Sequence, residues 1–250
     1  MWIRDGQNRQ SGGSLLLEPT SHGFWHPFLS KWHAYRIGKT FQAGTGFKTM
    51  EDVRQLKGKK LLFPLHVTPE ASTDVWAPQF NDMLQTATRI VEHLPPDWTL
   101  VMKEHPTAIY LQRNPSELEA LRALPRSILV SPLASNEELL KECVLLVISS
   151  TLGLEALVKG YPLITLGKPF FDASGNTLAL DDFARLPEVL RDVLHFKPAP
   201  LKTERFIARY FDCTNPGNPV NPQLFPNLKS QIKEDLIAED FASRFLKSKP

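Results

Sequence analysis

Short unbroken apolar runs alternate with helical patterns along the middle of the chain. Five runs read as buried strands: 61–65, 99–102, 128–130, 144–148 and 163–166. Continuous apolar runs, rather than alternating ones, are typical of a parallel sheet that helices cover on both faces. Right-handed crossovers between such strands make a Rossmann-like layer the expected arrangement. The pattern therefore predicts an α/β fold with a Rossmann-like parallel sheet and helices on both faces.

Helix start and stop signals separate these runs. Apolar residues recur at spacings of three and four from Phe80 to Leu94, which predicts one amphipathic helix packed on the sheet. Asn114 and Ser135 stand where caps are expected, each just before a further helical pattern. Gly160 closes another helix as the usual left-handed cap. The strands and helices thus alternate as in βαβ units.

The chain is expected to have three parts. Residues 1–58 read as an irregular segment with a short helix near 30–36, and residues 59–197 as the Rossmann-like domain. Residues 198–250 read as a proline-rich connector and a final amphipathic helix, because six prolines occur between 198 and 226. The apolar stripe of that last helix either packs across domains or touches an anionic membrane surface.

Composition excludes several classes of protein. The 250 residues carry 29 Lys and Arg against 27 Asp and Glu, and a net charge of +2 gives no general attraction for nucleic acid. Cys143 and Cys213 cannot build a disulfide framework or a zinc cluster, so a reducing, cytoplasmic location is expected, and no metal is expected. The start of the chain has no apolar stretch typical of a signal peptide, and no segment reads as membrane-spanning.

Two polar side chains follow the second expected strand. Lys103 ends that strand, and His105 lies two residues further on, so both point to the same side. In open α/β sheets ligands bind beyond the carboxyl ends of the strands, where a cation and an imidazole can converge on one anion. The alternative is a strand-end lysine that only solvates its charge.

Three hydroxyl residues precede the helix after the fourth expected strand. Ser149, Ser150 and Thr151 stand where the first backbone N–H groups of a helix lack partners, so they can cradle a phosphate. The alternative is plain N-capping, for which one hydroxyl suffices. Glu155, one turn beyond Thr151, either accepts hydrogen bonds from ribose hydroxyls or stabilises the helix dipole as a first-turn acid.

Four segments together resemble a known family: Pro64-Leu65, Lys103-Glu104-His105-Pro106, residues 149–157 and residues 160–167. They are similar to the capsule polysaccharide biosynthesis and export family, which includes the β-Kdo glycosyltransferases of bacterial capsule assembly. The resemblance covers about residues 59–190. It implies the nucleotide-binding half of a GT-B glycosyltransferase, with CMP-Kdo as the expected donor and a glycan or glycolipid as acceptor.

The resemblance also implies roles for single residues. Lys103 and His105 would hold the donor phosphate and stabilise it as it leaves, and Ser149, Ser150 and Thr151 would complete the cradle. Glu155 would contact the ribose. The family often has a glutamine and an Asp-Ser pair after the first strand, and here His66 and Ser72 stand in roughly those places. His66 is therefore expected among the nucleotide-binding residues. No cofactor or metal is implied, and the general base is not assigned.

Only 58 residues precede the Rossmann-like region, too few for a full acceptor domain. The chain therefore reads either as a glycosyltransferase or as a truncated or non-catalytic nucleotide-binding module, with a partner chain supplying the acceptor half of a split enzyme. Another nucleotide-sugar enzyme, of epimerase or glycerophosphotransferase type, is a third reading. If the protein is a glycosyltransferase of this family, we also expect a role in polysaccharide transport and a location in the cytoplasm, at the surface of the inner membrane.

Overall fold

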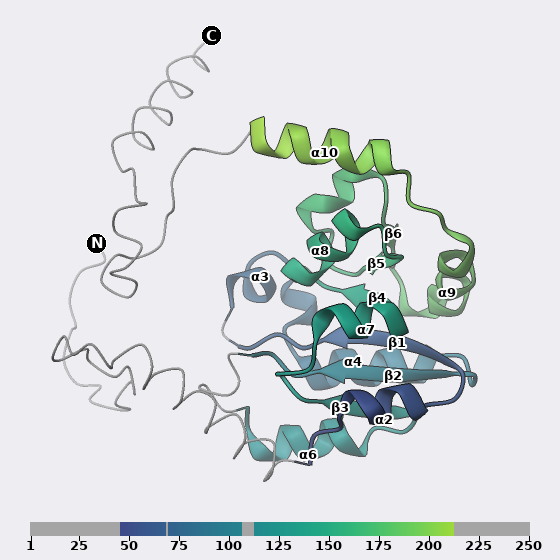
Figure 1. Cartoon of the computed structure of the whole chain (residues 1–250). Coiled ribbons are helices and arrows are strands. Elements are labelled where there is room, and N and C mark those ends of the chain that lie inside the picture. Colours follow the sequence, from purple (N-terminus) through teal and green to yellow (C-terminus); the bar gives the residue numbers. More distant parts are fainter. Residues whose placement is uncertain (1–45, 69, 107–112, 213–250) are drawn as a thin grey trace, which may run out of the picture. The chain divides into compact units, whose positions relative to one another are not determined.

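The computed structural model describes residues 46–68, 70–106 and 113–212. Contacts divide the chain into two units, residues 1–46 and 47–250, and every element below belongs to the second. Six parallel strands form one sheet in the order β3-β2-β1-β4-β5-β6 (Figure 1). They are β1 (Lys59–Pro64), β2 (Trp98–Lys103), β3 (Ser127–Val130), β4 (Val144–Val147), β5 (Leu163–Thr165) and β6 (Leu178–Ala179). The predicted α/β fold and its five strands are confirmed, and β6 is added at the edge.

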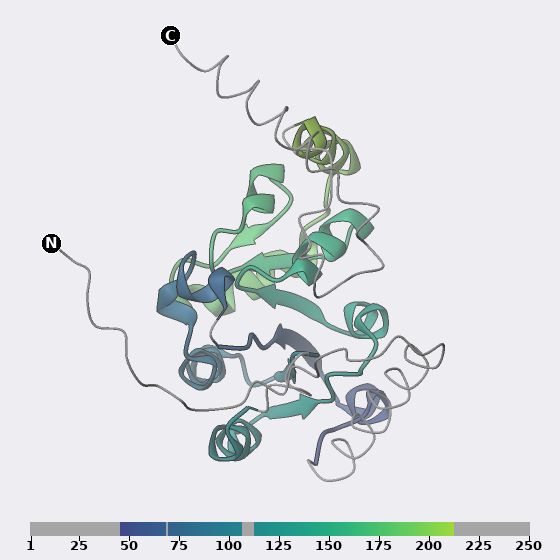
Figure 2. The ribbon, with the colours of Figure 1, turned by 90° about the vertical axis from the view of Figure 1, so that its left-hand side faces the viewer.

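Helices cover both faces of this sheet, as the unbroken apolar runs predicted. One face packs against α4 (Met83–His93), α6 (Pro115–Ala123) and α9 (Leu186–His195). The other packs against α2 (Met50–Gln55), α7 (Asn136–Glu142) and α8 (Thr151–Lys159). Figure 2 shows α4 and α6 on one side of the strands and α2 and α7 on the other. Because side chains alternate along a strand, each of the strands β1 to β5 supplies both cores.

The predicted caps are present. The side chains of Asn114, Ser135 and Ser150 each accept a hydrogen bond from a backbone N–H in the first turn of α6, α7 and α8. Gly160 ends α8 in the left-handed region at φ 73°. These local signals fix where the helices begin and end, and so fix which residues reach the edges of the sheet.

Helices α2 and α10 (Pro200–Asp212) lie in segments that were expected to be an irregular segment and a proline-rich connector. Helix α2 falls within the segment read as irregular, and a capping box between Thr49 and Asp52 starts it. Helix α10 replaces the first part of the expected proline-rich arm. The prolines stand before and after this stretch, and Pro200 occupies the first helical position, where its missing N–H costs nothing.

The expected helices near 30–36 and at 228–245 lie outside the described residues. Among the residues that the structure does describe, no helix is long and apolar enough to span a bilayer.

The strand order places a topological switch point between β1 and β4. Connections run outward from β1 through β2 to β3, and outward from β4 through β5 to β6. Loops on the carboxyl side of the two neighbouring strands therefore turn away from each other, which is the arrangement at which open α/β sheets bind ligands.

Candidate functional site

Lys103 ends β2 at the carboxyl edge of the sheet. Its side chain is largely buried and its Nζ donates a hydrogen bond to Oδ1 of Asn136, the first residue of α7. Burial lowers the pKa of this ammonium, and the Glu155 carboxylate opposes that change. The cation is thus held between the first turn of α7 and the second turn of α8.

His105 follows two residues later at the same edge and is half-buried. Burial is the main cause that lowers the pKa of its imidazole below 6.5. The carboxylates of Glu70 and Glu104 oppose this change, whereas His66 and Lys103 reinforce it. The imidazole therefore lies within electrostatic reach of groups from the ends of both β1 and β2.

His66 lies just beyond β1 and is buried. Its Nδ1 is 3.0 Å from Oε2 of Glu70, and its backbone N–H donates to the sulfur of Met83 at 3.3 Å. These contacts hold the chain between β1 and α4 close to the strand end. The ring that was expected to contact the nucleotide is thus buried and held by Glu70.

The three hydroxyl residues after β4 differ in their contacts and in their exposure. Ser150 caps α8, with its Oγ accepting from Leu152 N at 3.2 Å, so the plain capping role holds for this residue. Thr151 is exposed at the first helical position, and Ser149 is half-buried before the cap. Thr151 and the N-terminus of α8 are therefore the groups in this segment that could contact an anion.

Glu155 stands in the second turn of α8, which has no acid in its first turn. The interpretation of Glu155 as a first-turn acid is therefore wrong. Its carboxylate accepts from Lys159 Nζ at 2.8 Å, and it also acts electrostatically on Lys103. The helix thus presents this acid toward the lysine that ends β2.

Three further residues support the site and were missed by sequence reasoning. Glu104, fully buried between Lys103 and His105, is paired with Arg113 through Nε at 2.7 Å and Nη2 at 3.0 Å. Asn136 holds Lys103 from another helix. The alternation of a strand was the available signal for Glu104, because it must point opposite to its neighbours. Nothing local marked Arg113 or Asn136.

All the predicted site residues lie at the carboxyl edge of the sheet, around its switch point. Lys103 and His105 follow β2, His66 follows β1, and residues 149–155 follow β4. Strands β2 and β4 flank β1, so their ends are two strand spacings apart, about 10 Å. In the described part of the chain, no three His, Cys, Asp or Glu side chains are grouped to hold a metal ion.

The arrangement defines an α/β protein with a basic, hydroxyl-lined edge at a Rossmann-type switch point. The family model for capsule polysaccharide biosynthesis proteins matches residues 26–186, more than half of the chain. The chain therefore belongs to the capsule polysaccharide biosynthesis protein family, as its motifs predicted.

Several solved structures are similar to this chain. The β-Kdo 2,7-transferase KpsC of Thermosulfurimonas dismutans has 19% identity and a TM-score of 0.44, covering 68% of this chain and 57% of its own. The β-Kdo 2,4-transferase KpsC of the same organism has 16% identity and a TM-score of 0.42, covering 72% and 55%. MnaA of S. aureus, solved with UDP, has 17% identity and a TM-score of 0.41, covering 67% and 50%.

The chain thus spans little more than half the length of the KpsC structures that it resembles. No curated protein sequence matches it significantly.

Proposed function

We propose that this protein binds the nucleotide of an activated sugar at the carboxyl edge of β1, β2 and β4 and acts as a glycosyltransferase in surface polysaccharide assembly. The observation that carries the proposal is the meeting of a buried lysine, an imidazole and a helix N-terminus at the switch point. CMP-Kdo is the donor that we propose, from the resemblance of the motifs.

The chemistry of glycosyl transfer explains why these groups suit the site. Negative charge gathers on the departing nucleotide phosphate as the glycosidic bond breaks, and fixed positive groups stabilise it. Lys103 supplies a cation whose partial burial weakens solvent screening, and the N–H groups at the start of α8 supply a partial positive charge. Losing one such group is expected to raise the barrier by about 3 kcal/mol, or about a hundredfold in rate.

Nucleotide binding can be tested by thermal unfolding of the full chain. CMP is expected to raise the melting temperature, with UDP and CDP-glycerol weaker at the same concentration. Lys103→Met should weaken CMP binding about tenfold to a hundredfold, since hydrogen bonds to charged groups contribute about 1.5–3 kcal/mol. Lys57→Met is the matched control, because Lys57 is exposed before β1 at the opposite edge of the sheet.

The nucleotide that binds distinguishes the proposed function from its alternatives. A preference for UDP or CDP-glycerol would favour another nucleotide-sugar enzyme, and no shift with any of the three nucleotides would overturn the proposed site. An equal loss in both lysine variants would mean that the nucleotide binds elsewhere.

A second candidate is a nucleotide-binding module that needs another chain for catalysis. The observation in its favour is that all strands named in the described residues belong to one six-stranded sheet, which corresponds to one half of a two-domain glycosyltransferase. Incubation with CMP-Kdo and a Kdo-terminated glycolipid separates the two candidates. CMP release with transfer of Kdo supports the enzyme, whereas CMP binding without transfer supports the module.

A further inference from the structure

A second concave site lies between helix α10 and the 3-10 helix η2 (Phe170–Ser174), which follows β5 along the chain. Nine residues line a groove of about 640 Å³, and six of them carry aromatic or cationic side chains: Phe170, Lys202, Arg205, Phe206, Arg209 and Tyr210. This volume is in the range of small-molecule sites. Neither the motifs nor the proposed function uses any of these residues.

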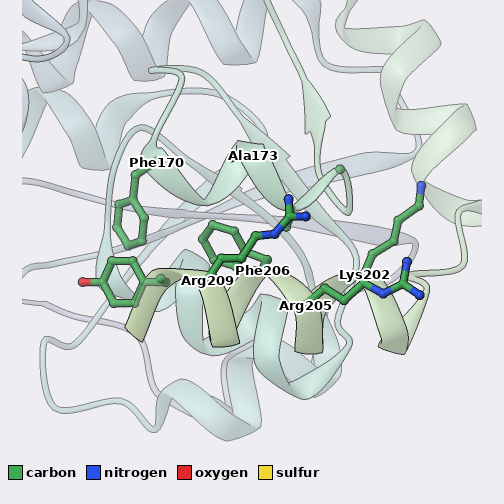
Figure 3. A pocket seen from close by; sticks show the side chains of 9 residues that line it. Phe170, Ala173, Lys202, Arg205, Phe206 and Arg209 are labelled. Atoms are coloured by element: carbon green, nitrogen blue, oxygen red, sulfur yellow. The ribbon is translucent and has the colours of Figure 1, made fainter. Parts of the chain in front are cut away.

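One end of the groove is aromatic. Phe170 and Tyr210 stack with their ring centroids 5.0 Å apart, and Phe206 lies 6.2 Å from both. Phe170 remains 52% exposed and Tyr210 37% exposed, although each stacks on a neighbour. Figure 3 shows Phe170 and Phe206 toward one end of the groove. The groove thus offers exposed ring surface to a ligand.

The rest of the groove is cationic. Lys202, Arg205 and Arg209 follow one another at spacings of three and four, so they share one flank of α10 over about 10 Å. Figure 3 shows Arg205 and Lys202 together, with Arg209 extending past Phe206. No acid is among the nine lining residues, and within the described residues none of these three cations forms an ion pair.

A buried asparagine holds the two sides of the groove together. The Nδ2 of Asn176 donates to Ala199 O and to Thr203 Oγ1, both at 2.8 Å, and its Oδ1 accepts from Ala199 N at 3.0 Å. Asn176 is only 2% exposed and lies two residues after the end of η2. The start of α10 is therefore fixed against η2, and the groove is preformed.

We propose that this groove binds a carboxylated glycan. The apolar face of a sugar ring suits the aromatic end, and guanidinium groups pair with carboxylates through two parallel hydrogen bonds. The recess does not suit a planar lipid surface, and the balanced overall charge does not suit a nucleic-acid polymer. The choice of a sugar ligand rests on the proposed function, whereas the anionic charge follows from the groove itself.

The test measures binding of tetragalacturonate to the full chain by calorimetry, with maltotetraose as the uncharged sugar of equal length. Tetragalacturonate should bind, and maltotetraose should bind at least about tenfold more weakly. The double variant Arg205→Gln/Arg209→Gln should lose about tenfold or more in affinity for tetragalacturonate. The double variant Arg191→Gln/Lys197→Gln removes the same charge from exposed sites outside the groove and should bind as the wild type does.

Three results would overturn the inference: equal binding of both sugars, equal loss in the two double variants, or no binding of tetragalacturonate. Phosphatidylglycerol vesicles and a short oligothymidylate serve as competing probes. Binding of either through Arg205 and Arg209, stronger than that of tetragalacturonate, would assign the groove to lipid or nucleic acid instead.

The nucleotide experiment keeps this inference separate from the proposed function. The groove variants should retain the CMP shift of the wild type, which also confirms that they fold. A CMP shift without sugar binding rejects the groove inference alone. Sugar binding at the groove without any CMP shift rejects the nucleotide site alone.

Discussion

The guanidinium of Arg113 holds the carboxylate of Glu104 through two hydrogen bonds of 2.7 and 3.0 Å in a setting where the two side chains are 7% and 0% exposed. The same guanidinium donates to the backbone oxygen of His66 at 2.8 Å and to Glu117 at 2.7 Å. One side chain thus ties together the ends of β1 and β2 and the start of α6. The positions of Lys103 and His105 depend on this arrangement.

Replacing Arg113 should therefore destabilise the fold strongly. Arg113→Leu leaves the buried charge of Glu104 without its partner, which is expected to lower the free energy of unfolding by about 3–5 kcal/mol. Urea unfolding measures this change. Arg54→Leu is the control, because Arg54 pairs with Glu138 at 3.3 Å on the surface, where such pairs contribute about 1 kcal/mol or less. Equal losses in the two variants would show that the buried pair contributes no more to the free energy of unfolding than the surface pair does.

Gly153 lets α8 approach η2 closely. A Cβ at this position would stand 2.5 Å from Cζ of the buried Phe171 and 3.0 Å from Cγ2 of Val147. Gly153→Ala should lower the free energy of unfolding by about 1–3 kcal/mol through overpacking, although alanine is the better helix former by about 1 kcal/mol. Chemical denaturation gives the value. Adding Phe171→Leu should make room, so strictly additive effects in the double variant would contradict this explanation.

His105 should make stability depend on pH. Its pKa in the folded protein lies below 6.5 because of burial, so the unfolded chain binds more protons between that lowered pKa and 6.5. The free energy of unfolding should therefore rise with pH across this window and level off above it. Comparing wild type with His105→Gln isolates the effect: the difference between them should change across the window. A difference that stays constant would contradict the expected neutral imidazole.

Cys143 should be unreactive in the folded protein. Burial raises the pKa of its thiol to about 12, so only about one molecule in ten thousand carries the thiolate at pH 8. In the single-thiol variant Cys213→Ser, iodoacetamide should modify Cys143 far more slowly in native buffer than in urea. Mass spectrometry follows the labelling. Similar rates in both conditions would mean that the thiol is not buried.

Much of the fold could be predicted because its signals are local. Apolar runs identified the five long strands, and single capping residues such as Asn114, Ser135 and Gly160 marked helix ends. Helix α2 was missed because its capping box has Asp52 where glutamate or glutamine is usual. Helix α10 was missed because prolines on both sides obscured it. Strand order was not predictable, since crossovers leave it open.

The residues of the candidate site that lie at strand ends could be predicted from the sequence. Lys103 and His105 could be placed at the carboxyl edge from the length of the strand before them. The partner of Lys103 could not, because Asn136 lies 33 residues away and reads only as the residue after a cap. The role of Arg113 could not be predicted for the same reason, because its contact with His66 spans 47 residues. Contacts across such separations follow from the order of strands.

The different burial and contacts of residues 103–105 have a practical outcome for screening. Substitutions at positions 103, 104 and 105 should differ in their effect, because Glu104 is fully buried and paired with Arg113, whereas His105 is half-buried. Lys103 is buried and hydrogen-bonded to Asn136. A library randomised at these positions should separate by expression level before any binding assay. Clones altered at Glu104 would fail to accumulate, whereas clones altered only at His105 would accumulate normally and differ in ligand affinity. Clones altered at Lys103 would accumulate to an intermediate level, because they lose one buried hydrogen bond.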